Sequence, residues 1–100
     1  MNDLKNALRE FARERDWEKF HTPKNLSMAL AVEVAELLEH FQWLDGSDSP
    51  DLDPEKRVKV QEEIGDVFIY LVRLSDTLGV DPLFAAWQKL EQNKKKYPAD

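Results

Sequence analysis

The chain has 100 residues, of which 42% are hydrophobic and 34% are charged, and its formal net charge is −6. This length suits one domain, residues 1–100, with an ordinary globular composition. The negative charge argues against binding to a nucleic-acid polymer, and the absence of cysteine excludes disulfides and thiolate metal sites.

The pattern of the first 43 residues predicts two helices. Apolar residues at positions 4, 8 and 11 have helical spacing, which predicts an amphipathic helix that ends near Asp16. The segment WEKFHTPKN interrupts the pattern. A second helix is expected from about Leu26 to Trp43, with Asn25 as its N-cap.

The segment LDGSDSPDLD is rich in turn-forming residues and predicts a loop. Asp53 followed by proline then starts a third helix, which is expected to reach about Leu78, where Gly79 ends it. Asp81, again followed by proline, starts a fourth helix that is expected to end near Lys95. The sequence therefore predicts an all-α fold of four helices.

The two middle helices are apolar on more than one side, as the segment DVFIYLV of residues 66–72 illustrates. A single 100-residue chain has too little of its own surface to cover them. We therefore expect a homo-oligomer in which the second and third helices form a bundle. No apolar run approaches the roughly 20 residues of a membrane span, and the N-terminus lacks a signal-peptide pattern, so we expect a cytoplasmic protein without a membrane partner.

Two pairs of carboxylates interrupt these apolar helices. Glu33 and Glu36 are three residues apart on the second helix, and Glu63 and Asp66 have the same spacing on the third. Residues three apart share a helix face, and antiparallel packing of the two helices would bring both pairs to one level. Four converging carboxylates need a cation, and oxygen ligands favour Mg²⁺ or Mn²⁺.

The same carboxylates fit two other interpretations less well. They can be solvated surface acids, as we expect Glu39, Glu55 and Glu62 to be. A di-iron site is disfavoured because it usually needs Glu-x-x-His on two helices, and the third helix has no histidine.

The pattern Glu33-Val-Ala-Glu36, then 26 residues, then Glu63-Ile-Gly-Asp66 resembles the all-α nucleotide pyrophosphohydrolases of the MazG type. The flanking segments FARERDWEKFHTPKNL, EVAELLEHFQW, EEIGDVFIYL and NKKKYP extend the resemblance over nearly the whole chain and place it nearest the dCTP pyrophosphatase branch.

The resemblance implies hydrolysis of a nucleoside triphosphate between its α- and β-phosphates, with Mg²⁺ held by the four acidic positions. It also implies dimers or tetramers, and a preference for deoxynucleotides, often those of cytidine. A carboxylate can take the proton from the attacking water, and Glu36 or Glu63 is the expected catalytic base. The alternative is a non-catalytic oligomeric module that binds a nucleotide or a partner.

Substrate contacts follow from the resemblance and from the chemistry of aromatic and basic side chains. By resemblance, the pocket for base and sugar is lined by Trp17, His21, Trp43 and Tyr70. Asn25 is expected to help shape it. Phe84 and Trp87 are expected to pack in the core. The basic end of the fourth helix predicts a clamp on the β- and γ-phosphates, built from Lys89, Asn93 and Lys96; a solvated helix end is the other interpretation.

Overall fold

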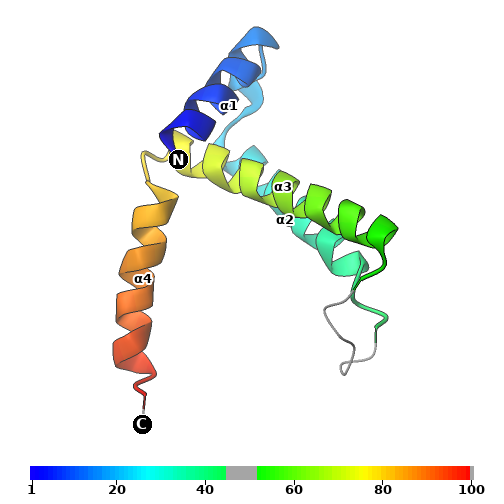
Figure 1. Cartoon of the computed structure of the whole chain (residues 1–100). Helices are drawn as coiled ribbons and strands as arrows, with labels where there is room; N and C mark the ends of the chain where they lie inside the picture. The colour runs from blue at the N-terminus through cyan, green and yellow to red at the C-terminus, as the bar shows by residue number, and fades with distance from the viewer. Residues whose placement is uncertain (45–51, 100) are drawn as a thin grey trace.

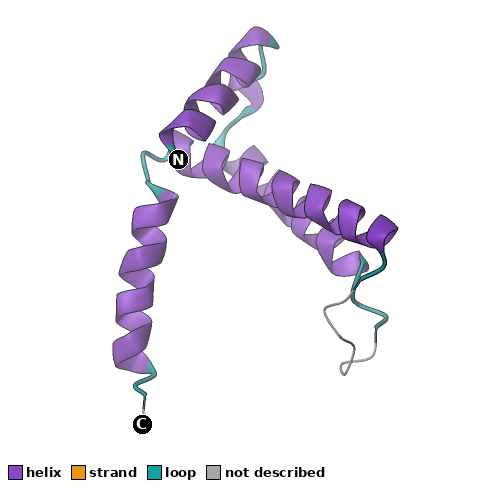
Figure 2. Cartoon of the chain, in the orientation of Figure 1, coloured by secondary structure: helices purple, strands orange, loops and turns teal. Residues whose placement is uncertain are grey.

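A computed structural model of the chain describes residues 1–44 and 52–99. In these residues every regular secondary-structure element is a helix, which confirms the all-α class and the predicted helices (Figures 1 and 2). The elements are α1 (Asn2–Glu14), the short 3-10 helix η1 (Glu18–Phe20), α2 (Pro23–Glu39), α3 (Pro54–Thr77) and α4 (Pro82–Lys96). The predicted loop LDGSDSPDLD falls mainly on residues 45–51, which lie outside the described residues.

The predicted boundaries of α3 and α4 are confirmed, and side-chain caps explain them. The Asp53 carboxylate accepts a hydrogen bond from the Lys56 N–H at 2.9 Å, and the Asp81 carboxylate accepts one from the Leu83 N–H at 2.9 Å. Each cap is followed by a proline, whose missing N–H costs nothing in the first helical turn. Gly79 follows α3 with a φ of 68°, in the left-handed region that favours glycine.

The prediction for the start of α2 was wrong. Thr22, and not Asn25, is the N-cap, because its hydroxyl accepts a hydrogen bond from the Asn25 N–H at 3.2 Å and Pro23 takes the first helical position. The helix also ends at Glu39, four residues before the predicted end at Trp43, and the chain continues in turns. The Asn25 side chain instead donates a hydrogen bond to the Phe20 carbonyl at 2.9 Å and holds η1 against the start of α2.

The packing of the helices positions the carboxylates. α2 and α3 run antiparallel side by side, as predicted, while α1 packs on the C-terminal part of α3 (Figure 1). α4 meets α3 near their junction and then extends away from the other helices (Figure 2). No helix among the described residues is long and apolar enough to cross a membrane.

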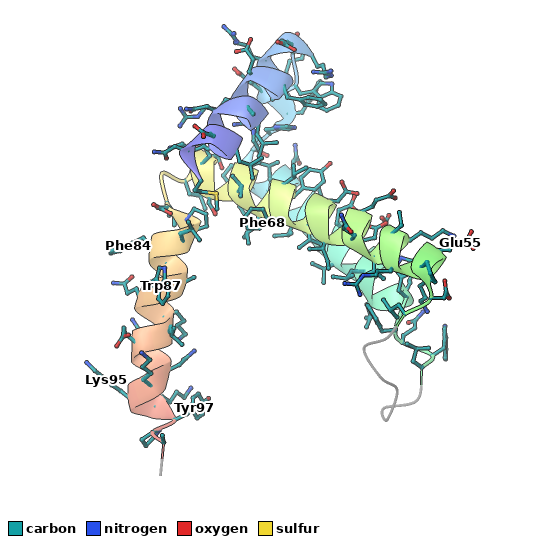
Figure 3. The ribbon with its side chains drawn as sticks, in the orientation of Figure 1. Glu55, Phe68, Phe84, Trp87, Lys95 and Tyr97 are labelled. Atoms are coloured by element: carbon teal, nitrogen blue, oxygen red, sulfur yellow. The ribbon has the colours of Figure 1, made fainter. Side chains whose placement is uncertain are left out.

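The core of the single chain is small. Its buried apolar residues are Ala12, Leu26, Val60 and Val72. The radius of gyration is 16.5 Å, whereas about 13 Å is expected for a compact domain of this length. Core packing of Phe84 and Trp87 within the chain was a wrong prediction, because they are 65% and 67% exposed along α4, and no other described helix faces most of its length (Figure 3).

Candidate metal centre and adjoining pocket

Three carboxylates converge where α2 and α3 pack together. One oxygen from each of Glu33, Glu36 and Glu63 lies within 4.8 Å of the others. Glu33 and Glu36 share a face of α2 because they are three residues apart, and the antiparallel partner helix presents Glu63 to the same face. All three side chains are partly buried between the helices.

The electrostatics of this cluster favour a bound cation. Burial first, and then the neighbouring carboxyl groups of Glu63 and Glu36, together raise the pKa of Glu33 to about 7. Within the described residues, Glu33 Oε2 and Glu63 Oε2 are buried without a hydrogen-bond partner. A buried acceptor without a partner is costly, and a hard divalent cation would satisfy both oxygens. The donor set therefore fits Mg²⁺.

Asp66, the fourth predicted ligand, occupies a different place from the other three. It lies three residues after Glu63 on α3 but is exposed and is not one of the converging group. It lines a neighbouring pocket instead. In the single chain Asp66 is thus the acidic residue that connects the carboxylate cluster to that pocket.

The pocket lies between α1, α3 and the segment that carries η1, and its volume is about 210 Å³. It brings together three of the predicted base-binding residues, Trp17, His21 and Tyr70. The Trp17 ring meets Phe11 edge-on, with ring centroids 5.6 Å apart. The lining residues are Leu8, Phe11, Ala12, Trp17, His21, Asp66, Ile69, Tyr70 and Arg73.

A chain of polar contacts behind the pocket was missed by the sequence analysis. Arg73 Nε donates a hydrogen bond to His21 Nδ1 at 3.1 Å, and its guanidinium lies 3.4 Å from the Asp76 carboxylate. Arg9 donates two hydrogen bonds to the same carboxylate, at 2.7 and 2.6 Å. The hydrogen bonds from Arg9, together with the charge of Arg73, lower the pKa of Asp76. Burial, and then the charge of Arg73, lower the pKa of His21. The partners are as many as 67 residues apart, so helical periodicity could not reveal them.

The remaining predicted residues are not brought to the carboxylates within one chain. Trp43 is 88% exposed in the turns after α2, and Asn25 makes the local contact with η1. The proposed phosphate clamp lies on the part of α4 that points away, close to the labelled Lys95 (Figure 3); its residues are Lys89, Asn93 and Lys96. Glu39, Glu55 and Glu62 are exposed, as expected.

Two known proteins are similar in sequence to nearly the whole chain. The human and rat proteins named dCTP pyrophosphatase 1 are 46% and 45% identical to the chain over 101 and 100 residues. These matches cover 99% and 98% of this chain but 59% of each relative, so the chain spans about three-fifths of their length.

A solved structure has the same fold as this chain. The crystal structure of a pyrophosphatase from Archaeoglobus fulgidus aligns with a TM-score of 0.86 at 46% identity, over 99% of this chain and 93% of that one. Residues 28–100, which contain all four predicted metal ligands, match the model of the MazG-like family. The chain therefore belongs to the MazG-like family.

Proposed function

We propose that the chain hydrolyses a nucleoside triphosphate to the monophosphate and pyrophosphate, with Mg²⁺ as its cofactor and Mn²⁺ as a possible substitute. The observation that carries the proposal is the convergence of Glu33, Glu36 and Glu63, two of which hold buried oxygens without a partner among the described residues. The names of the relatives support deoxycytidine triphosphate, or a modified form of it, as the substrate.

Each part of the site has a role in this reaction. Glu33, Glu36, Glu63 and Asp66 would hold the cation, which supplies charge neutralisation for the polyphosphate and a lowered pKa for water. Glu36 or Glu63 would take the proton from the water that attacks the α-phosphorus. The aromatic pocket next to Asp66 would hold the base, because its faces suit a flat π-system.

The phosphate clamp requires a second copy of the chain in this proposal. α4 extends away from the carboxylates of its own chain, so Lys96 and Asn93 cannot reach a triphosphate bound there without a large movement (Figure 1). In a homodimer or homotetramer, α4 of one copy can lie over the carboxylates of another. The exposed apolar residues of α4, among them Trp87, would be covered in the same contact.

The test is pyrophosphate release from a panel of ribo- and deoxynucleoside triphosphates, with Mg²⁺ and with EDTA. Release that requires the metal and is fastest with a deoxycytidine nucleotide is the expected result. Loss of a residue that supports a metal ligand typically costs roughly 10–100-fold in activity. Glu33→Gln removes a proposed ligand itself, so it should reduce turnover by more than that. Glu39→Gln, an exposed glutamate on the same helix, is the matched control and should keep wild-type turnover.

A non-catalytic binding module is the competing proposal, and the same panel separates the two. It predicts no pyrophosphate release from any nucleotide. A chain that releases no pyrophosphate but melts at a higher temperature when a nucleotide is present would favour the binding module and contradict the enzyme.

A further inference from the structure

We infer that Arg73 is a positioning residue, which holds His21 as a neutral imidazole with its proton on Nε2 so that His21 donates a hydrogen bond to the bound base. The inference rests on the proposed function, because it assigns the pocket to a nucleobase. Its structural half, the fixed tautomer of His21, can be tested without any turnover.

The geometry of the Arg73–His21 contact decides the tautomer. An arginine guanidinium has only donors, so the Nε–H of Arg73 can bond to Nδ1 of His21 only if that nitrogen carries a lone pair. A neutral imidazole has one protonated and one unprotonated ring nitrogen. With Nδ1 accepting, the proton must be on Nε2, and a doubly protonated ring would place an N–H against the guanidinium.

Arg73 is itself held in place from two sides. Its side chain is 11% exposed, and it pairs with the Asp76 carboxylate, which is 8% exposed and is also bound by two nitrogens of Arg9. The contacts therefore run from α1 through α3 to the residue that follows η1. This arrangement fixes the guanidinium that faces His21, so the imidazole has one preferred orientation and one preferred tautomer.

The consequence for the pocket is that His21 offers a donor of fixed position in a mostly apolar lining. Within the described residues, Nε2 of His21 has no protein acceptor, while His21 lines the pocket together with Trp17 and Tyr70. A donor there favours a ligand with a carbonyl oxygen or an unprotonated ring nitrogen at its edge. Cytosine carries both of these acceptors. An apolar pocket that leaves a donor unpaired penalises ligands without an acceptor.

The first measurement is the tautomer of His21 in the free wild-type protein, by long-range ¹H–¹⁵N correlation NMR. The chain has only two histidines, so a His40→Gln variant assigns the signals. We expect His21 to show a protonated Nε2 and an unprotonated Nδ1, and Arg73→Met to give a mixture of tautomers. A wild-type His21 that is protonated on Nδ1, or that already averages between tautomers, would overturn the inference even if the chain releases pyrophosphate.

The second measurement links the tautomer to the ligand. Arg73→Met should raise KM for deoxycytidine triphosphate by about 3- to 10-fold, the value of one hydrogen bond, with a smaller change in kcat. It should leave KM for 2-deoxyribose 5-triphosphate, which has no base, nearly unchanged. Arg57→Met, on the same helix but away from the pocket, is the matched control.

Parallel loss of activity toward both compounds would mean that Arg73 only supports the fold, and would overturn the inference. If no nucleotide is hydrolysed at all, the proposed function fails. The NMR result for the wild-type chain still decides whether Arg73 fixes the tautomer of His21.

Discussion

The ionisation of Glu33 affects both metal binding and the stability of the folded chain. Burial and the adjacent carboxyl groups raise its pKa from the ordinary value of 4.5 to about 7. A carboxyl whose pKa is raised on folding binds its proton more tightly in the folded chain than in the unfolded chain. Its contribution to stability is therefore fully present below about pH 4.5 and is lost as the pH rises through about 7.

The metal-free protein should consequently become less stable between pH 5 and 8. In EDTA, we expect the melting temperature of the wild type to fall across this range by more than that of Glu33→Gln, because the amide does not titrate. At pH 8, Mg²⁺ should restore stability by binding the ionised cluster, by about 2.7 kcal/mol at 100 times its Kd. Calorimetric melting of both chains, with Glu39→Gln as control, checks this; equal pH slopes in the two chains would contradict it.

The candidate site was predictable from the sequence where helix geometry alone decides the contacts. Two acids three residues apart must share a face, so the convergence of Glu33 and Glu36 with Glu63 follows once the helices pack antiparallel. The contact of Arg73 with His21 joins residues that are 52 apart and depends on how the chain turns before α2. No local pattern encodes such a contact, and so the sequence analysis missed it.

Helix boundaries were predictable where a cap and a proline occur together. Asp53 and Asp81 precede prolines, and both helices begin there. The same signal is present at Thr22 and Pro23, ahead of the apolar pattern that starts at Leu26, and the helix begins at the proline and not after the predicted cap Asn25. The cap and proline signal marks the start of α2 better than the apolar pattern, because the first turn of a helix is often polar and exposed.

Two glycines on or after α3 should respond to alanine in opposite directions. Gly79 has a φ of 68°, which costs an alanine about 1–2 kcal/mol, although no atom within 4 Å would contact its Cβ. Gly65 is helical with equally open space, so alanine should stabilise it by up to about 1 kcal/mol. Thermal melting should show shifts of about 4–8 °C per kcal/mol. Destabilisation by Gly65→Ala would contradict this prediction and indicate that another copy approaches the helix there.

The isolated chain exposes more surface than a compact monomeric protein of the same mass. Its accessible area is 7961 Å², whereas a compact monomer of 11.7 kDa exposes about 5,900 Å². The excess of about 2,000 Å² is more than the roughly 800 Å² that each partner buries in a typical interface. The direction of α4 explains part of the excess. This direction could not be predicted from the sequence, because the sequence of an amphipathic helix does not show whether its apolar face packs on its own chain or on another.

If α4 of one copy completes the site of another, two inactive variants should restore each other. Glu33→Gln removes a carboxylate and Lys96→Met removes the clamp, and each is expected to lose most pyrophosphate release as a pure protein. In a mixture refolded together at equal amounts, about a quarter of the sites would combine an intact carboxylate cluster with an intact α4, if the two chains pair at random across a symmetric interface. Activity should therefore return to about a quarter of the wild-type rate.

The matched control is a mixture of Glu33→Gln with Glu36→Gln, in which every chain lacks one carboxylate of its own cluster. No site in that mixture can have an intact cluster, whichever chains associate, so it should stay inactive. Recovery in the first mixture alone would place Lys96 across a subunit boundary, because only exchange of α4 distinguishes the two mixtures. An inactive first mixture that contains hybrid oligomers would show that Lys96 acts within its own chain, and α4 would then have to fold back over α2 and α3 when substrate binds.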